Sequence, residues 1–152
     1  MSDLKDLYQQ LILDHYKHPR NRRKLEPADR SCEGFNPLCG DRLTVYLQVH
    51  EDMVEDICFE GSGCAISTAS ASLMTESLKG KTVQQAQALF EEFHRLVTVG
   101  PSTNTEPQPM GKLVVFAGIS KYPARVKCAS LAWHTFRAAL ENAQTVVSTE
   151  RE

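Results

Sequence analysis

The chain has 152 residues, of which 41% are hydrophobic and 24% charged, a balance typical of one soluble globular domain and unlike a disordered or fibrous protein. Its formal net charge of −2 gives no electrostatic attraction to nucleic acid or to an anionic membrane. The longest apolar stretch, residues 113–119, is far shorter than the roughly 18 residues of a membrane helix, so neither kind of partner is expected.

The first half of the chain predicts a helix followed by a β-hairpin. Apolar residues first recur every three or four positions, as in an amphipathic helix, and later alternate with polar residues, as in a strand with one buried face. The predicted elements are a helix over 4–18, an irregular connection over 19–34 with a short strand near 32–34, a strand over 43–49, a turn at 51–53 and a strand over 54–60.

The second half predicts three helices and one long excursion. Thr82 and Gln85 have the spacing of a capping box, in which two side chains satisfy free backbone N–H groups at a helix start. The predicted elements are a helix over 64–80, a helix from Thr82 to Val97, an irregular excursion over 98–124 with an ordered piece at 113–117, and a helix over 125–147. This order predicts a single α+β domain over 1–152, a small antiparallel sheet packed against helices.

Three of the five cysteines, Cys39, Cys64 and Cys128, each precede or open a predicted element. A thiolate is both a nucleophile and a metal ligand, and the N-terminus of a helix lowers the pKa of a thiol. We expect this effect at Cys64, and at Cys128 in the first turn of the last helix beside Lys127. Cys39 and Asp41 would face one point if the backbone between them is extended. Three thiolates with a carboxylate suit tetrahedral zinc, and the spacing also leaves a nucleophilic or a purely structural role open.

Other chemistry is not favoured by the sequence. The chain has no H-E-x-x-H or G-x-S-x-G motif, no P-loop and no dinucleotide-binding glycine pattern. A set of three cysteines and one aspartate lacks the open position of a catalytic zinc, which disfavours a zinc hydrolase. The N-terminus, MSDLKDLYQQ, does not resemble a signal peptide, so we expect a cytoplasmic protein with reduced thiols. Cys32 and Cys58 are interpreted as buried apolar residues, with a part for Cys32 at the site left open.

The three cysteine segments resemble the cysteine motifs of the IscU/NifU-N/SufU family of iron–sulfur cluster biogenesis. They are NPLCGD at 36–41, GSGCAISTASAS at 61–72 and RVKCASLAW at 125–133. The resemblance covers nearly the whole chain and implies the family's α+β fold. It also implies that one metal site is formed by Cys39, Asp41, Cys64 and Cys128.

Three features resemble the SufU branch of this family more than the IscU branch. IscU-type proteins carry a histidine directly before the third cysteine, where this chain has Lys127. Residues 121–125 keep only a proline and a basic residue of the IscU chaperone-docking segment, and the excursion over 98–124 lies where SufU proteins have an insertion. The resemblance implies a zinc-bound sulfur acceptor in which Cys39 takes persulfide sulfur from a SufS-type cysteine desulfurase and passes it to downstream Suf scaffold proteins.

Two alternatives remain at the level of sequence. In the first, the protein is an IscU-like scaffold that binds iron and assembles a [2Fe–2S] cluster on the same cysteines, a binding role and not an enzymatic one. In the second, it is a structural zinc module without transfer chemistry. Iron and zinc compete for such ligands, so the ligand set alone does not separate a sulfurtransferase from a scaffold.

Overall fold

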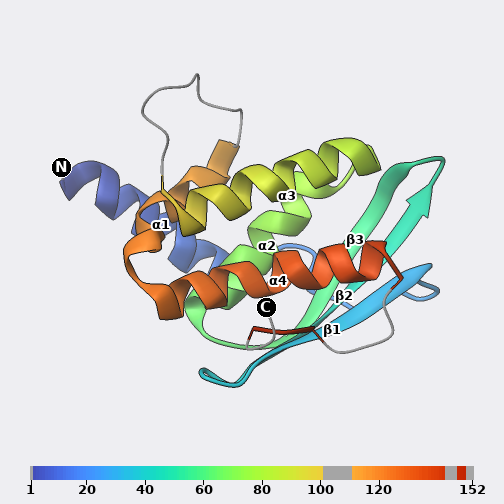
Figure 1. Ribbon diagram of the computed structural model, residues 1–152, viewed down its shortest axis with the longest axis horizontal. Coiled ribbons are helices and arrows are strands. Elements are labelled where there is room, and N and C mark those ends of the chain that lie inside the picture. Colours follow the sequence, from blue (N-terminus) through green and yellow to red (C-terminus); the bar gives the residue numbers. More distant parts are fainter. Residues whose placement is uncertain (1, 101–110, 143–146, 150–152) are drawn as a thin grey trace.

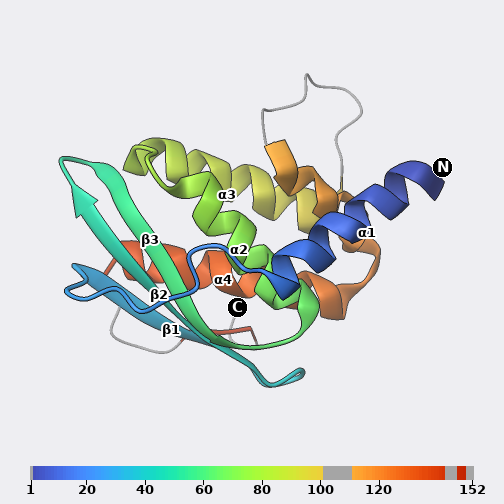
Figure 2. The same cartoon turned by 180° about the vertical axis from the view of Figure 1, so that it is seen from behind.

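The strands of the protein lie on one side and the helices on the other (Figures 1 and 2). The computed structural model describes residues 2–100, 111–142 and 147–149. Its elements are α1 (Ser2–Lys17), β1 (Arg30–Asn36), β2 (Asp41–His50), β3 (Met53–Ser62), α2 (Ala65–Leu78), α3 (Val83–Thr98), the 3₁₀ helix η1 (Gly111–Lys121), α4 (Pro123–Leu140) and β4 (Val147–Ser148). The predicted α+β class is confirmed. Within the described residues, no helix has the length and apolar character needed to span a bilayer.

The sheet has the strand order β3-β2-β1-β4. β2 pairs antiparallel with β1 and β3, whereas the short edge strand β4 runs parallel to β1, so the sheet is mixed and not purely antiparallel as predicted. Glu51 and Asp52 turn the chain between β2 and β3 with φ angles of 52° and 63°. Positive φ at both central residues matches the twist of a tight hairpin.

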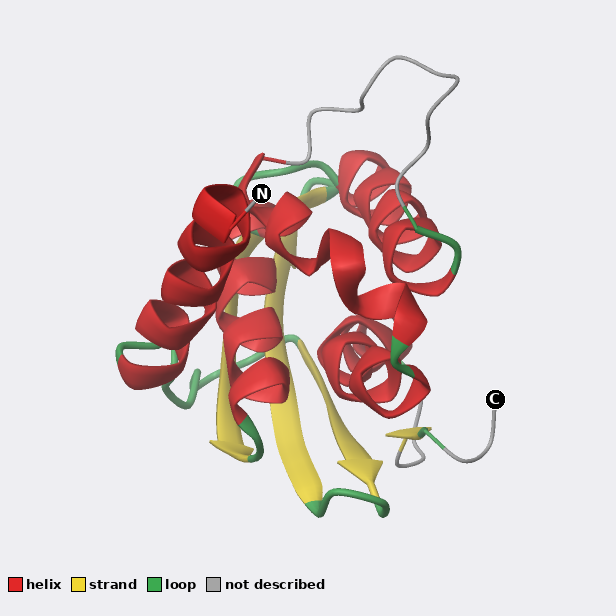
Figure 3. Ribbon diagram, turned by 90° about the vertical axis from the view of Figure 1, so that its left-hand side faces the viewer, coloured by secondary structure: helices red, strands yellow, loops and turns green. Residues whose placement is uncertain are grey.

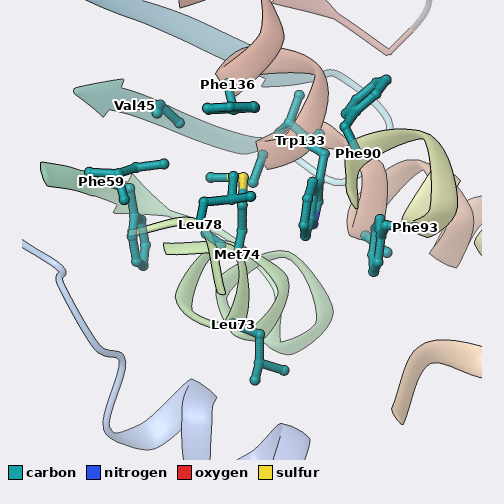
Figure 4. Close-up of a cluster of buried hydrophobic side chains, with 14 of the residues drawn as sticks. Val45, Phe59, Leu73, Met74, Leu78, Phe90, Phe93, Trp133 and Phe136 are labelled. Atoms are coloured by element: carbon teal, nitrogen blue, oxygen red, sulfur yellow. The ribbon is translucent and has the colours of Figure 1, made fainter. Parts of the chain in front are cut away.

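Helix α4 covers the inner face of β1 and β2, and Figure 3 shows the helices in front of the strands. The approach is close at Gly34, where an added Cβ would lie 2.1 Å from Oγ1 of Thr135. Figure 4 shows the aromatic part of the core between α3 and α4. There Phe93 stacks on Trp133 with ring centroids 4.5 Å apart. The close contact of α4 with β1 at Gly34 and the aromatic packing of α4 on α3 together hold α4, and with it Cys128, in place against the sheet.

Three predicted elements differ from the structure. Helix α4 begins at Pro123, two residues before the predicted start, and ends at Leu140, so the predicted end at Val147 is wrong and Val147 belongs to β4. The connection over 19–34 contains most of the seven-residue strand β1, whose backbone pairs with β2 along its whole length. The excursion over 98–124 includes the 3₁₀ helix η1, whose apolar side chains reach the core. Residues 101–110 of that excursion lie outside the described residues.

Candidate metal centre

Ligand atoms of Cys39, Asp41 and Cys128 all lie within 4.8 Å of one another. Cys39 is in the turn between β1 and β2, Asp41 is the first residue of β2, and Cys128 is in the second turn of α4. Sγ of Cys128 lies 3.5 Å from Sγ of Cys39, within hydrogen-bonding distance. Packing of α4 on the sheet therefore brings together residues that are 89 positions apart in the chain.

The turn that carries Cys39 is not extended, so the condition under which Cys39 and Asp41 were expected to converge is not met. Gly40 has φ +74°, and its N–H donates to the carbonyl of Asn36 at 2.8 Å. Only glycine adopts this conformation without a steric cost. The result is that Cys39 is exposed at the tip of the turn while Asp41 is fully buried, although their ligand atoms still converge.

Asp41 joins the first cysteine turn to the second one. Its Oδ1 accepts from the backbone N–H of Cys64 at 2.8 Å, and its Oδ2 lies 3.9 Å from Sγ of Cys64. Gly63 makes room for this carboxylate, since an added Cβ would lie 2.8 Å from Oδ1. One carboxylate oxygen is thus held by the backbone and the other is turned toward the thiols.

Cys64 is the N-cap of α2, and its Sγ accepts from the backbone N–H of Ser67 at 3.4 Å. A hydrogen bond from Cys128 and this backbone N–H lower the pKa of Cys64 to about 7. The pKa of Cys128 is raised, because its thiol donates to Cys64 and because the group is buried. The predicted lowering is therefore confirmed at Cys64 and wrong at Cys128, which lies beyond the first helical turn.

The donor set fits a tetrahedral zinc ion. With Zn–S bonds of about 2.3 Å and a Zn–O bond of about 2.1 Å, ligand atoms in a tetrahedron are roughly 3.6–3.8 Å apart. The observed separations are 3.5 Å between the sulfurs of Cys39 and Cys128 and 3.9 Å between Cys64 Sγ and Asp41 Oδ2. Cys64 stands at the edge of this arrangement and is not a member of the group whose atoms all lie within 4.8 Å.

The other residues considered from sequence lie elsewhere. Lys127 is half-buried and lines a cavity of about 300 Å³ with His94, Ser130 and His134 among its neighbours. Cys32 and Cys58 are buried in the sheet, as predicted.

Sequence reasoning missed Asn36, although this residue begins the NPLCGD motif. Its side-chain amide donates to Oδ2 of Asp41 at 3.3 Å and to Sγ of Cys128 at 3.5 Å. This side chain is fully buried, so its NH₂ group is held against two candidate ligands. An asparagine directly ahead of the cysteine turn was the only available signal in the sequence.

The fold and the cluster define a class of protein, a small α+β domain with a thiol–carboxylate cluster that could hold a metal ion. Residues 7–129 match the family model described as NifU-like N terminal domain, and the chain belongs to this family.

The relatives and solved structures include both sulfurtransferases and scaffolds by name. The chain is 40% identical to the zinc-dependent sulfurtransferase SufU of Bacillus subtilis (strain 168), over 87% of this chain and 88% of that protein. It is 36% identical to the iron–sulfur cluster assembly scaffold protein IscU of Streptococcus pyogenes serotype M1, over 93% and 87% of the two chains. A crystal structure from Fervidobacterium islandicum AW-1, described as an iron–sulfur cluster assembly scaffold protein for the SUF system, superposes with a TM-score of 0.79 at 35% identity, covering 86% of this chain and 94% of that one.

Proposed function

We propose that the protein binds zinc through Cys39, Asp41, Cys64 and Cys128 and accepts sulfur on Cys39 from a cysteine desulfurase during iron–sulfur cluster assembly. The observation that carries the proposal is the contrast in exposure among the ligands. Cys39 is exposed at the tip of its turn, whereas Asp41 is 0% and Cys128 4% exposed. Cys64 is half-buried, so Cys39 is the most accessible thiol of the set, and a partner protein can reach it while the buried ligands keep the site assembled. Similarity to the zinc-dependent sulfurtransferase SufU supports this assignment.

The transfer is a thiol–disulfide type of exchange. Bound zinc would keep the thiols deprotonated at neutral pH. The thiolate of Cys39 attacks the terminal sulfur of the persulfide on the desulfurase and forms a new S–S bond. The S–S bond of the donor breaks at the same time, and the desulfurase cysteine leaves as a thiolate. The sulfane sulfur moves to Cys39 without net oxidation or reduction.

The surroundings of Cys39 suit a protein partner. Leu38, directly before it, is 63% exposed, so an apolar side chain lies beside the acceptor thiol where a docking partner would contact the turn. Lys127 occupies the position before Cys128, where the resemblance to IscU types would require histidine, and this favours sulfur acceptance over cluster assembly. We place the desulfurase in the SufS class and the onward acceptors among downstream Suf scaffold proteins in the cytoplasm.

The test mixes the zinc-loaded protein with a SufS-type desulfurase and cysteine and measures alanine formation. The wild-type protein should increase turnover, because it removes the persulfide from the desulfurase. Cys39→Ser should abolish this increase, whereas the control Cys32→Ser should preserve it, since Cys32 is buried in β1. Full stimulation by Cys39→Ser would exclude the proposed acceptor.

The scaffold function is the main alternative to sulfur acceptance. Protein purified without added metal would then contain stoichiometric iron and the visible absorbance of an iron–sulfur cluster, and it would not need zinc. Such a result together with unchanged desulfurase turnover would favour the function named for the IscU relatives.

A further inference from the structure

We infer that Asn36 is a positioning residue for the metal centre and that the C-terminal strand β4 holds it in place. This inference rests on the metal site of the proposed function and adds to it a contact between distant parts of the chain. The observation behind it is a fully buried side-chain amide with hydrogen-bond partners on both of its ends.

The NH₂ end of Asn36 faces the candidate ligands. It donates to Oδ2 of Asp41 at 3.3 Å and to Sγ of Cys128 at 3.5 Å. These two acceptors belong to β2 and α4, so one amide group spans the two elements whose packing forms the site. Hydrogen bonds to ligating groups fix their orientation and alter metal affinity, typically by 10–100-fold when the outer partner is removed.

The carbonyl end of Asn36 faces two donors. The backbone N–H of Leu38 donates to Oδ1 at 3.2 Å, and the hydroxyl of Thr149 donates to it at 3.1 Å. The Leu38 N–H can only donate, so it requires an oxygen at this end and thereby turns the NH₂ group toward the ligands.

Strand β4 positions the second of these donors, Thr149, which directly follows it in the chain. Val147 and Ser148 pair in parallel with Gly34 and Phe35 of β1, and the backbone N–H of Thr149 donates to the carbonyl of Phe35 at 3.2 Å. These contacts place the Thr149 hydroxyl, itself buried, against the side chain of Asn36. The strand therefore connects the C-terminal part of the described chain to the ligands through a single amide.

Two substitutions separate positioning from a purely structural role. Asn36→Leu removes both ends of the amide at similar volume, and Thr149→Val removes only the hydroxyl. Thr149→Ser keeps the hydroxyl and serves as the control. Thr149→Val is the second arm if Asn36→Leu does not fold.

The readouts are zinc affinity by competition with a chromophoric chelator, the visible spectrum of the Co²⁺-loaded protein, and the Tm of the metal-free protein. We expect roughly 10–100-fold weaker zinc binding for Asn36→Leu, a smaller loss with a shifted Co²⁺ spectrum for Thr149→Val, and wild-type values for Thr149→Ser. In the metal-free protein, the Tm loss of the double variant should be smaller than the sum of the losses of Asn36→Leu and Thr149→Val. Both substitutions remove the same hydrogen bond, the one between the Thr149 hydroxyl and Asn36.

Wild-type zinc affinity and Co²⁺ spectra in both variants, with lower Tm values only, would overturn the inference while leaving the metal site intact. Additive Tm losses in the metal-free double variant would also overturn it. Failure of the wild-type protein to bind zinc would instead overturn the proposed metal site, and the inference with it.

Discussion

Gly63→Ala should weaken the proposed metal centre without replacing any candidate ligand. The new Cβ would lie 2.8 Å from Oδ1 of Asp41, so the carboxylate must move to the 3.4 Å of ordinary van der Waals contact, a displacement of about 0.6 Å. Metal–ligand distances tolerate only about 0.2 Å. Asp41 cannot move freely, because the N–H of Cys64 and the amide of Asn36 both hold it.

We expect zinc affinity to fall by roughly 10–100-fold, as for the loss of an outer-sphere contact, and overpacking to cost about 1–3 kcal/mol of stability. In a domain of this size, each kcal/mol lowers Tm by roughly 2–4 °C. Chelator competition and thermal melting of the metal-free protein measure the two effects. The control is Gly118→Ala in η1, where an added Cβ meets no atom within 4 Å. Zinc affinity and Tm within error of the wild type for Gly63→Ala would refute the packing described around Asp41.

Three further predictions concern stability and docking. Burial lowers the pKa of His134 to about 4. Below about pH 6.5 the unfolded chain binds a proton at His134 that the folded state does not, so the free energy of unfolding should fall as the pH drops from 6.5 toward 4. This loss should be smaller in His134→Phe, which urea titrations at several pH values would show. An equal acid loss in both proteins would contradict this assignment. Phe93→Ala removes the ring stacked on Trp133 and should lower the free energy of unfolding by about 3–5 kcal/mol in urea titrations. The control Val99→Ala, at a position 75% exposed, should change it by less than about 0.5 kcal/mol. Similar values for the two variants would be inconsistent with the core in Figure 4. Leu38→Asp should raise the concentration needed for half-maximal desulfurase stimulation by roughly tenfold with unchanged zinc affinity, and an unchanged titration would show that the turn tip is not covered by the partner.

Regular local patterns made much of the fold predictable. Alternation along 43–49 and the capping box at Thr82 fixed β2 and the start of α3, because neighbouring residues determine both features. The strand β4 was not predictable in this way. Its two residues pair with β1 across more than one hundred positions, and no local pattern encodes that contact.

The candidate ligands were predictable as residues but not as a geometry. Cysteines at the starts of predicted elements, with an aspartate nearby, indicated candidate metal ligands. The family resemblance then implied that Cys39, Asp41, Cys64 and Cys128 form one site. The turn at Gly40 is closed locally by its hydrogen bond to Asn36, whereas the contact of the Asn36 amide with Cys128, 92 positions away, exists only because α4 packs against the sheet. Tertiary contacts of this kind also explain why the pKa of Cys128 is raised although a helix start predicted the opposite.

The most direct test of the central proposal is to locate the transferred sulfur. The zinc-loaded protein is incubated with a SufS-type desulfurase and ³⁴S-labelled cysteine, alkylated, digested and analysed by mass spectrometry. The account predicts a labelled persulfide on the peptide that contains Cys39 and on no other cysteine peptide of the chain. Label on Cys64 or Cys128 with none on Cys39, or no labelled persulfide at all while the desulfurase is active, would contradict it.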